Sequence, residues 1–205
     1  MKKVPTVFIA VVVIFLSACG NDNHESESNA DTISPTELSK REDAIISTTA
    51  ENSFVFDYKL STAFKEVEVW IEKYESGKLV DDELNKLSTQ IDRDDGMIIL
   101  AASEIDGETT YHLGISDKGG TSSTFNTPDH DSKHKADQLV ESSQLTNKKT
   151  FKDSEENILA TITYSDDENK PGTEITNDFF EKPESHADDL NDYDIAYVLK
   201  AKFIQ

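Results

Sequence analysis

Apolar and polar residues alternate with a period of two through much of this chain, and that alternation limits what the chain can fold into. Successive side chains of a β-strand point to opposite faces, so the alternation predicts strands with one buried face. Residues 97–102 instead form an unbroken apolar run, which predicts a strand that is buried on both faces. The alternating segments are residues 54–60, 67–71, 111–115, 158–164 and 193–203.

Turn residues separate these segments. Asp106-Gly107 predicts a two-residue hairpin, and Gly77 and Gly119-Gly120 predict further turns. The pattern shows no strand–helix–strand alternation and no repeat of fixed length. Roughly seven strands joined by turns predict a mainly β fold. We expect an antiparallel β-sandwich or partly open barrel with one or two short helices.

Two segments predict short helices. Ser34-Pro35-Thr36-Glu37 resembles a helix start, so we expect a helix over residues 35–44. Residues 81–91 place Leu84, Leu87 and Ile91 at helical spacing, with Asp81 as the cap. We expect polar or charged loops over residues 126–135 and 166–172. Residues 177–192 are expected to be irregular, with Phe179-Phe180 packed on the core. The pattern of residues 136–145 fits either a helix or a strand.

Composition restricts the partners. The formal net charge is −21, so nucleic acid and other anionic polymers are poor candidate partners. Such a charge is also typical of a highly soluble surface. The chain has one cysteine, Cys19, so no disulfide supports the fold.

The N-terminal residues have the organisation of a secretory signal. Lys2 and Lys3 are followed by ten uncharged, mostly apolar residues, 7–16. That run is shorter than the roughly 20 residues that span a bilayer and suits the apolar region of a signal peptide. We therefore expect residues 1–18 to be a signal peptide.

Leu16-Ser17-Ala18-Cys19 ends that segment, and it resembles the lipobox of bacterial lipoproteins: an aliphatic residue, two small residues and a cysteine. The resemblance implies cleavage between Ala18 and Cys19, an S-diacylglycerol group on Cys19 and an N-acyl group there in some hosts. It also implies a lipid-anchored protein on the outer face of the cell membrane. The alternatives are an ordinary signal peptide with an incidental cysteine, or an uncleaved anchor.

The residues after the cysteine contain little that a core could bury. Residues 19–32 are expected to be the lipidated cysteine and a flexible acidic tether, and residues 33–205 a single, mostly β extracytoplasmic domain. In this layout the chain resembles small lipid-anchored β-domain proteins of Gram-positive-type bacteria that have no assigned function. The resemblance carries no motif beyond the lipobox and transfers no site.

Three polar clusters are candidate metal sites. His130 and His134 stand four residues apart, but Thr127-Pro128 precedes them and indicates a loop. Asp92–Asp95 resembles the start of a calcium loop but has Ser103 where the bidentate glutamate is required. Residues 166–169 are similar and equally incomplete. We expect no structural metal and no cofactor.

Trp70 is the one tryptophan. The alternation places it on the strand face of Glu66, Glu68 and Glu72, opposite Val67, Val69 and Ile71. An outward tryptophan could stack on a sugar or a partner; alternatively, another layer of the protein covers that face. Trp70 is therefore a weak candidate for a binding residue.

The sequence carries little that points to catalysis. It has no G-x-S-x-G elbow, phosphate loop or dinucleotide fingerprint, and it does not single out a carboxylate pair for glycoside cleavage. The leading hypothesis is a membrane-tethered, non-enzymatic binding or accessory domain for an unknown protein or glycan ligand. The alternatives are a lipid-anchored hydrolase of cell-wall material and an acidic inhibitor or immunity lipoprotein.

Overall fold

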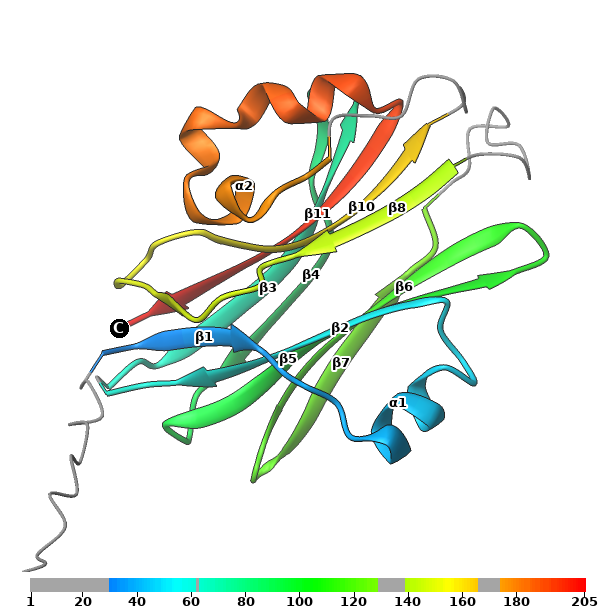
Figure 1. Cartoon of the computed structure of the whole chain (residues 1–205). Coiled ribbons are helices and arrows are strands. Elements are labelled where there is room, and N and C mark those ends of the chain that lie inside the picture. The colour runs from blue at the N-terminus through cyan, green and yellow to red at the C-terminus, as the bar shows by residue number, and fades with distance from the viewer. Residues whose placement is uncertain (1–29, 62, 129–138, 166–173) are drawn as a thin grey trace, which may run out of the picture.

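Two antiparallel sheets pack face to face in the computed structural model, which describes residues 30–61, 63–128, 139–165 and 174–205 (Figure 1). The prediction of a mainly β antiparallel sandwich is confirmed. The described residues also include two short α-helices and two 3-10 turns, in line with the expected one or two helices.

The first sheet has six strands in the order β7-β6-β5-β2-β1-β9. Most neighbours in this sheet are also successive in the chain, as expected for strands joined by hairpins. Its strands are β1 (Thr32–Pro35), β2 (Asn52–Lys59), β5 (Asp95–Ile105), β6 (Glu108–Asp117), β7 (Gly120–Asn126) and β9 (Lys149–Thr150).

The second sheet has five strands in the order β4-β3-β11-β10-β8. The last strand of the chain is its centre, since β11 pairs along its length with β3 on one side and β10 on the other. This confirms the prediction that residues 193–203 lie within a sheet. The strands are β3 (Glu66–Glu75), β4 (Lys78–Gln90), β8 (Leu139–Gln144), β10 (Asn157–Ser165) and β11 (Ile195–Ile204).

The core lies between the sheets and is rich in aromatic rings. Tyr58 of β2 meets Phe203 of β11 edge to face, with ring centroids 5.2 Å apart. Phe151 stacks on Phe203 at 4.4 Å, and Phe64 packs against both rings. Aromatic burial and edge contacts of this kind contribute much of the packing energy of a small core. They also join the first sheet to the second.

Hydrogen bonds between side chains and strand backbones close one long side of the sandwich. The Asn126 side-chain amide of β7 donates to the Leu84 carbonyl of β4 at 2.6 Å, and that of Asn85 donates to the Tyr111 carbonyl at 3.1 Å. The outer strands β4 and β7 are thereby brought together.

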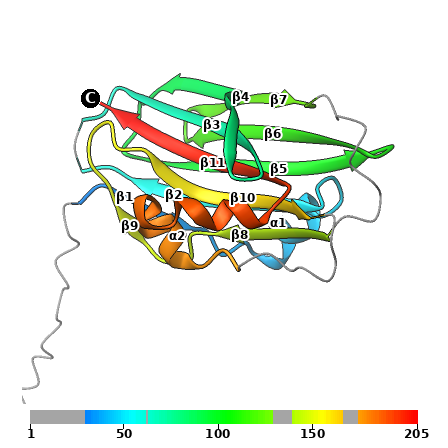
Figure 2. The same ribbon diagram turned by 90° about the horizontal axis from the view of Figure 1, so that it is seen from above.

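A helical segment covers part of the molecule near β10 (Figure 2). It comprises α2 (Asn177–Glu181), η1 (Pro183–Ser185) and η2 (Ala187–Asp192). Phe179 and Phe180 of α2 are buried, which confirms that this segment is held to the core.

The first helix starts later than the sequence suggested. Residues up to Pro35 belong to β1, and α1 (Lys40–Ile46) begins after Ser39. The Glu42 amide donates to the Ser39 hydroxyl at 3.3 Å, and the Ser39 amide donates to the Glu42 carboxylate at 2.8 Å. This is a full capping box, so Ser39-x-x-Glu42 outcompetes the similar pattern at Ser34.

The predicted helix over residues 81–91 is wrong, because this segment is the body of β4. Pairing with β3 decides the outcome, and a bulge interrupts it between Ile71 and Lys73. The bulge adds residues to β4 and breaks its period of two, so Leu84 and Leu87 acquire helical spacing without a helix. The open choice for residues 136–145 is settled for residues 139–144, which form β8.

The sandwich has two distinct ends. The chain enters the first sheet at Thr32, opposite Lys59 and at the same end of the sheet as the β6–β7 turn, and β11 also ends there (Figures 1 and 2). We call this the entry end. The far end holds the β5–β6 turn, the β3–β4 turn and α1. β1 begins at Thr32, one residue before the expected domain boundary, and Thr32 is buried.

Candidate functional site

Several predicted site residues lie outside the described residues. These are the lipidation and cleavage residues Cys19 and Ala18, the histidines His130 and His134, and the acidic segment 166–169. Within the part of the chain that the structure describes, no helix is long and apolar enough to cross a membrane.

The acidic segment Asp92–Asp95 is spread along the connection into β5 rather than gathered around one point. Asp92 and Asp94 are exposed, and Asp95 lies 3.4 Å from the Lys118 ammonium group. The Asp94 carbonyl accepts a hydrogen bond from the Leu60 amide at 2.7 Å. Among the described residues, no three carboxylate, imidazole or thiol groups are placed to hold a metal ion.

Trp70 lies on the outer face of the second sheet, but its side chain is only 5% exposed. The expectation of an aromatic surface that is free for stacking is therefore corrected. Among the described residues, charged side chains of the neighbouring strands provide the cover, and Lys202 places its ammonium 5.7 Å from the centre of the Trp70 ring. A cation at this distance is attracted to the ring face.

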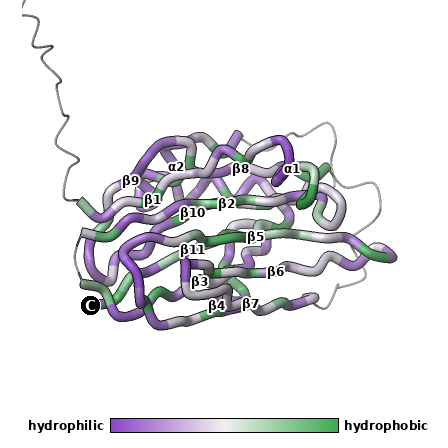
Figure 3. Tube along the Cα trace, turned by 90° about the horizontal axis from the view of Figure 1, so that it is seen from below, coloured by the Kyte–Doolittle hydropathy of each residue, from purple (hydrophilic) through white to green (hydrophobic). Residues whose placement is uncertain are grey.

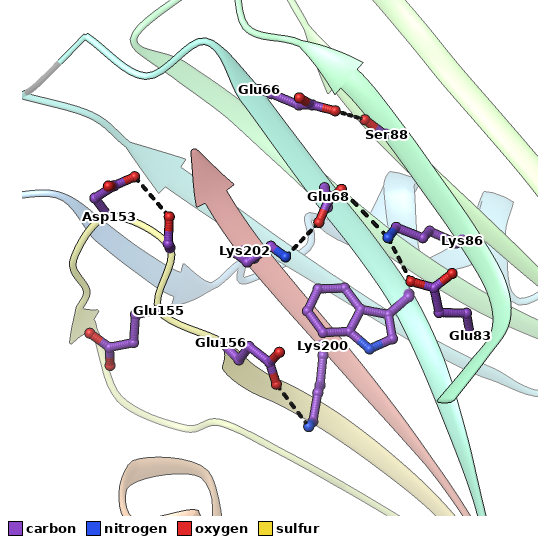
Figure 4. Close-up of polar contacts among 12 residues, drawn as sticks. Glu66, Glu68, Glu83, Lys86, Ser88, Asp153, Glu155, Glu156, Lys200 and Lys202 are labelled. Carbon is purple, nitrogen blue, oxygen red and sulfur yellow. Dashed lines mark hydrogen bonds and ion pairs between the residues drawn. The ribbon is translucent and has the colours of Figure 1, made fainter. Parts of the chain in front are cut away.

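The covering side chains form a network of ion pairs (Figure 4). Lys202 contacts Glu68 at 2.8 Å, and Lys200 contacts Glu72 at 2.8 Å and Glu156 at 3.2 Å. The hydrogen bond from Lys202 is the main reason that the pKa of Glu68 lies below its usual value. Carboxylates and ammonium groups alternate across three strands, so each charge has an opposite neighbour.

Two further contacts extend this network. Lys86 of β4 lies 2.7 Å from Glu83 and 3.5 Å from Glu68. The buried Glu72 accepts hydrogen bonds from the Trp70 indole at 3.3 Å and the Tyr74 hydroxyl at 2.6 Å. A buried carboxylate is tolerated when its oxygens are paired in this way. The arrangement stabilises the sheet and leaves no open stacking site over Trp70.

A cavity of about 400 Å³ opens at the entry end. Its lining includes Asp57, Lys59, Asp95, Asp117 and Lys118. A second cavity of about 260 Å³ shares Tyr58 and Asp117 with the first. Both volumes suit a small polar molecule, although Asp95 is already paired with Lys118.

Tyr58 stands between the two cavities. Burial, followed by the nearby charges of Asp117 and Asp95, raises the pKa of its hydroxyl to about 12. The phenol is therefore neutral near pH 7 and can act as a hydrogen-bond donor but not as a base. Gly96 makes room for it, since a side-chain carbon there would collide with the Tyr58 hydroxyl and lie 2.8 Å from the Ser116 carbonyl oxygen.

Exposed apolar side chains gather at the far end. Among the large apolar residues that are exposed in the described part of the chain, Met97 alone lies toward the entry end. The others belong to α1, to strand segments beside the far-end turns and to the start of β8: Ile45, Leu79, Val80, Ile105, Phe125, Leu139 and Val140. The prediction that residues 97–102 are buried on both faces is wrong, because only the row of Ile98, Leu100 and Ala102 is buried in the core.

Ile105 and Phe125 are the most exposed of these residues, at 72% and 69%. Sequence reasoning singled out neither of them. A signal was present for Ile105, because the residue directly before the Asp106-Gly107 turn must lie at the rim of its sheet. Phe125 alternates with polar residues in β7, and only the pairing of β7 with β6 shows that its ring points outward beside His112.

Fold and surface together define an acidic antiparallel β-sandwich with a covered, ion-paired outer face on one sheet and exposed apolar side chains at one end. The model of the YgaN domain family matches residues 32–203, so the chain belongs to the YgaN domain family. No curated protein and no solved structure matches the chain.

Proposed function

We propose that this protein is a membrane-tethered extracytoplasmic lipoprotein whose YgaN domain binds a protein or glycan without catalysis. Residues 1–19 support the anchor, through two lysines, an apolar run and the Leu16-Ser17-Ala18-Cys19 pattern. Two or more acyl chains on Cys19 hold a protein stably at a membrane, whereas a single chain is marginal. The protein then resides on the outer face of the cell membrane.

The observation that carries the binding role is the opposition of the two ends. The chain enters the sandwich at Thr32, and the exposed apolar side chains lie at the other end. A tether attached at the entry end presents the far end to the surroundings. Exposed apolar side chains that gather in one region are typical of interaction surfaces.

The anchor is tested by replacing Cys19 with Ala. We expect loss of labelling by a radioactive or clickable fatty acid, together with an uncleaved precursor or release into the medium. Ser17→Ala is the matched control, since it keeps a small residue in the lipobox and should preserve labelling. A processed Cys19→Ala protein that still partitions into the detergent phase would contradict the proposal.

A further inference from the structure

The outer faces of the two sheets differ in their cations. Around Trp70, the outer face of the second sheet carries Lys86, Lys200 and Lys202 among its carboxylates. In the first sheet, the strands β5, β6 and β7 themselves carry no lysine or arginine, since residues 94–117 and 119–128 contain none. We call the outer surface formed by Ile99, Ala101, Ile105, His112, Gly114 and Phe125 the cation-free face.

The strand register makes this face continuous. Ala101, His112 and Phe125 lie side by side on β5, β6 and β7, and the His112 and Phe125 rings are 5.9 Å apart. Ile99 lies beside Gly114 in the adjacent row. Figure 3 views the molecule from this side and shows β5, β6 and β7 without a described helix over them.

Phe125 and Ile105 are the most exposed side chains of this face. Phe125 and Ile105 stand roughly 16 Å apart, at two strand spacings across and four residues along the sheet. Between them lie the small residues Ser103 and Thr110, which are paired in register. An extended partner segment that lies across this face can therefore contact both exposed apolar side chains.

Carboxylates lie around Ile105. Glu108 is paired with Ile105 and lies on the same face, and Asp106 is exposed in the β5–β6 turn. Glu51 is adjacent, since its carboxylate accepts a hydrogen bond from the Glu104 amide at 2.8 Å. The described strands β5, β6 and β7 form an apolar surface with an acidic rim and no lysine or arginine of their own, and such a surface fits a partner that brings its own cations.

We infer that the cation-free face docks a protein segment in which an apolar side chain is flanked by lysine or arginine. This inference rests on the proposed binding function and names its partner class. The apolar side chain packs against Ile105 and the flanking cations pair with Asp106 and Glu108, while the rest of the segment runs along the face to Phe125. A second copy of this chain would bring like charges to the same rim, and an anionic wall polymer would be repelled.

Site-specific photocrosslinking of the full-length chain in the cells that make it tests this inference. The photoreactive residue p-benzoylphenylalanine replaces Phe125 or Ile105 on the cation-free face. The matched controls are Leu79, which is exposed at the far end on the second sheet, and Lys118, which is exposed at the entry end. All four positions are exposed, so the fold should tolerate each replacement.

We expect adducts from positions 125 and 105, and few from 79 and 118. Sequencing should place lysine or arginine within a few residues of the crosslinked site in the partner. Adding Glu108→Lys should reduce the adduct from position 125 by about tenfold, through loss of charge complementarity. An unchanged yield would overturn the assigned role of the acidic rim.

The remaining outcomes are equally decisive. Adducts confined to positions 79 or 118 would overturn the location of the docking surface while leaving a binding function in place. An adduct with a second copy of this chain, or with a partner segment that lacks cations, would overturn the partner class. Absence of adducts at every position would overturn the proposed binding function itself.

Discussion

Single residues on the outer face of the second sheet tie stability to pH. The pKa of Glu68 is lowered chiefly by its hydrogen bond from Lys202. A carboxyl group whose folded pKa lies below its unfolded value stabilises the folded state above the unfolded pKa. That contribution disappears as pH falls through the folded pKa.

Glu68→Gln should therefore destabilise the protein near pH 7 by about 0.5–1 kcal/mol, as expected for a partly exposed ion pair. The difference from the wild type should shrink as the pH falls below 4.5, the ordinary pKa of glutamate. Urea unfolding at a series of pH values measures this difference. Glu37→Gln, at an exposed position, is the control, and a Glu68→Gln effect independent of pH would contradict the assignment.

Two glycines in neighbouring strands provide a matched test of packing. A side-chain carbon at Gly96 would collide with Tyr58, whereas at Gly114 it would meet Ile99 at an ordinary 3.6 Å. Gly96→Ala should cost about 1–3 kcal/mol through overpacking. Gly114→Ala should lie within about 0.5 kcal/mol of the wild type. Chemical unfolding of both variants checks this, and equal effects would refute the close approach of Tyr58 to Gly96.

At the scale of elements, the last strand holds the second sheet together. β11 pairs with β3 and β10, and Phe203 stacks on Phe151 in the core. Each large buried side chain contributes about 1.5–3 kcal/mol, and a typical domain is stable by only about 5–15 kcal/mol. Deleting residues 193–205 should therefore give an unfolded or aggregating product.

Circular dichroism melting measures the effect of this deletion. Removal of residues 20–29 is the control and should leave the melting temperature unchanged. The control stops at residue 29 because Asp31 accepts a hydrogen bond from the Ser61 amide and Thr32 is buried in β1. A cooperative, near wild-type transition in the 193–205 deletion would show that β11 is dispensable.

At the scale of the whole molecule, the two ends should lie at different heights above the membrane. Strands of about ten residues separate them by roughly 33 Å. Cys19 is the one natural cysteine, so in the lipidated protein an introduced cysteine is the single free thiol. A dye on Lys118→Cys should be quenched more strongly by lipid-borne quenchers than the same dye on Ile105→Cys. Equal or reversed quenching would contradict attachment at the entry end.

The sequence predicted the elements whose patterns are local. The alternation in residues 54–60 predicted β2, and the alternation in residues 193–203 predicted β11. The Asp106-Gly107 turn predicted the β5–β6 hairpin. Buried faces repeat every second residue, and a two-residue turn requires particular residue types, so both features can be seen without a partner strand. Residues 81–91 could not be predicted in this way, because their state depends on pairing with β3 across a bulge.

The candidate surfaces, too, were predicted in part from the sequence and decided in part by the tertiary structure. By itself, the sequence determined the period of the strands, the acidic charge, the absence of cations from residues 94–117 and the face of its strand on which Trp70 lies. The tertiary structure alone decided that lysines of β11 cover Trp70 while Phe125 stays uncovered. Exposure depends on side chains that are distant in sequence and are brought together by strand order and register. The sequence of a single strand therefore indicates the face to which each side chain points, but it does not indicate which side chains of other strands lie next to it.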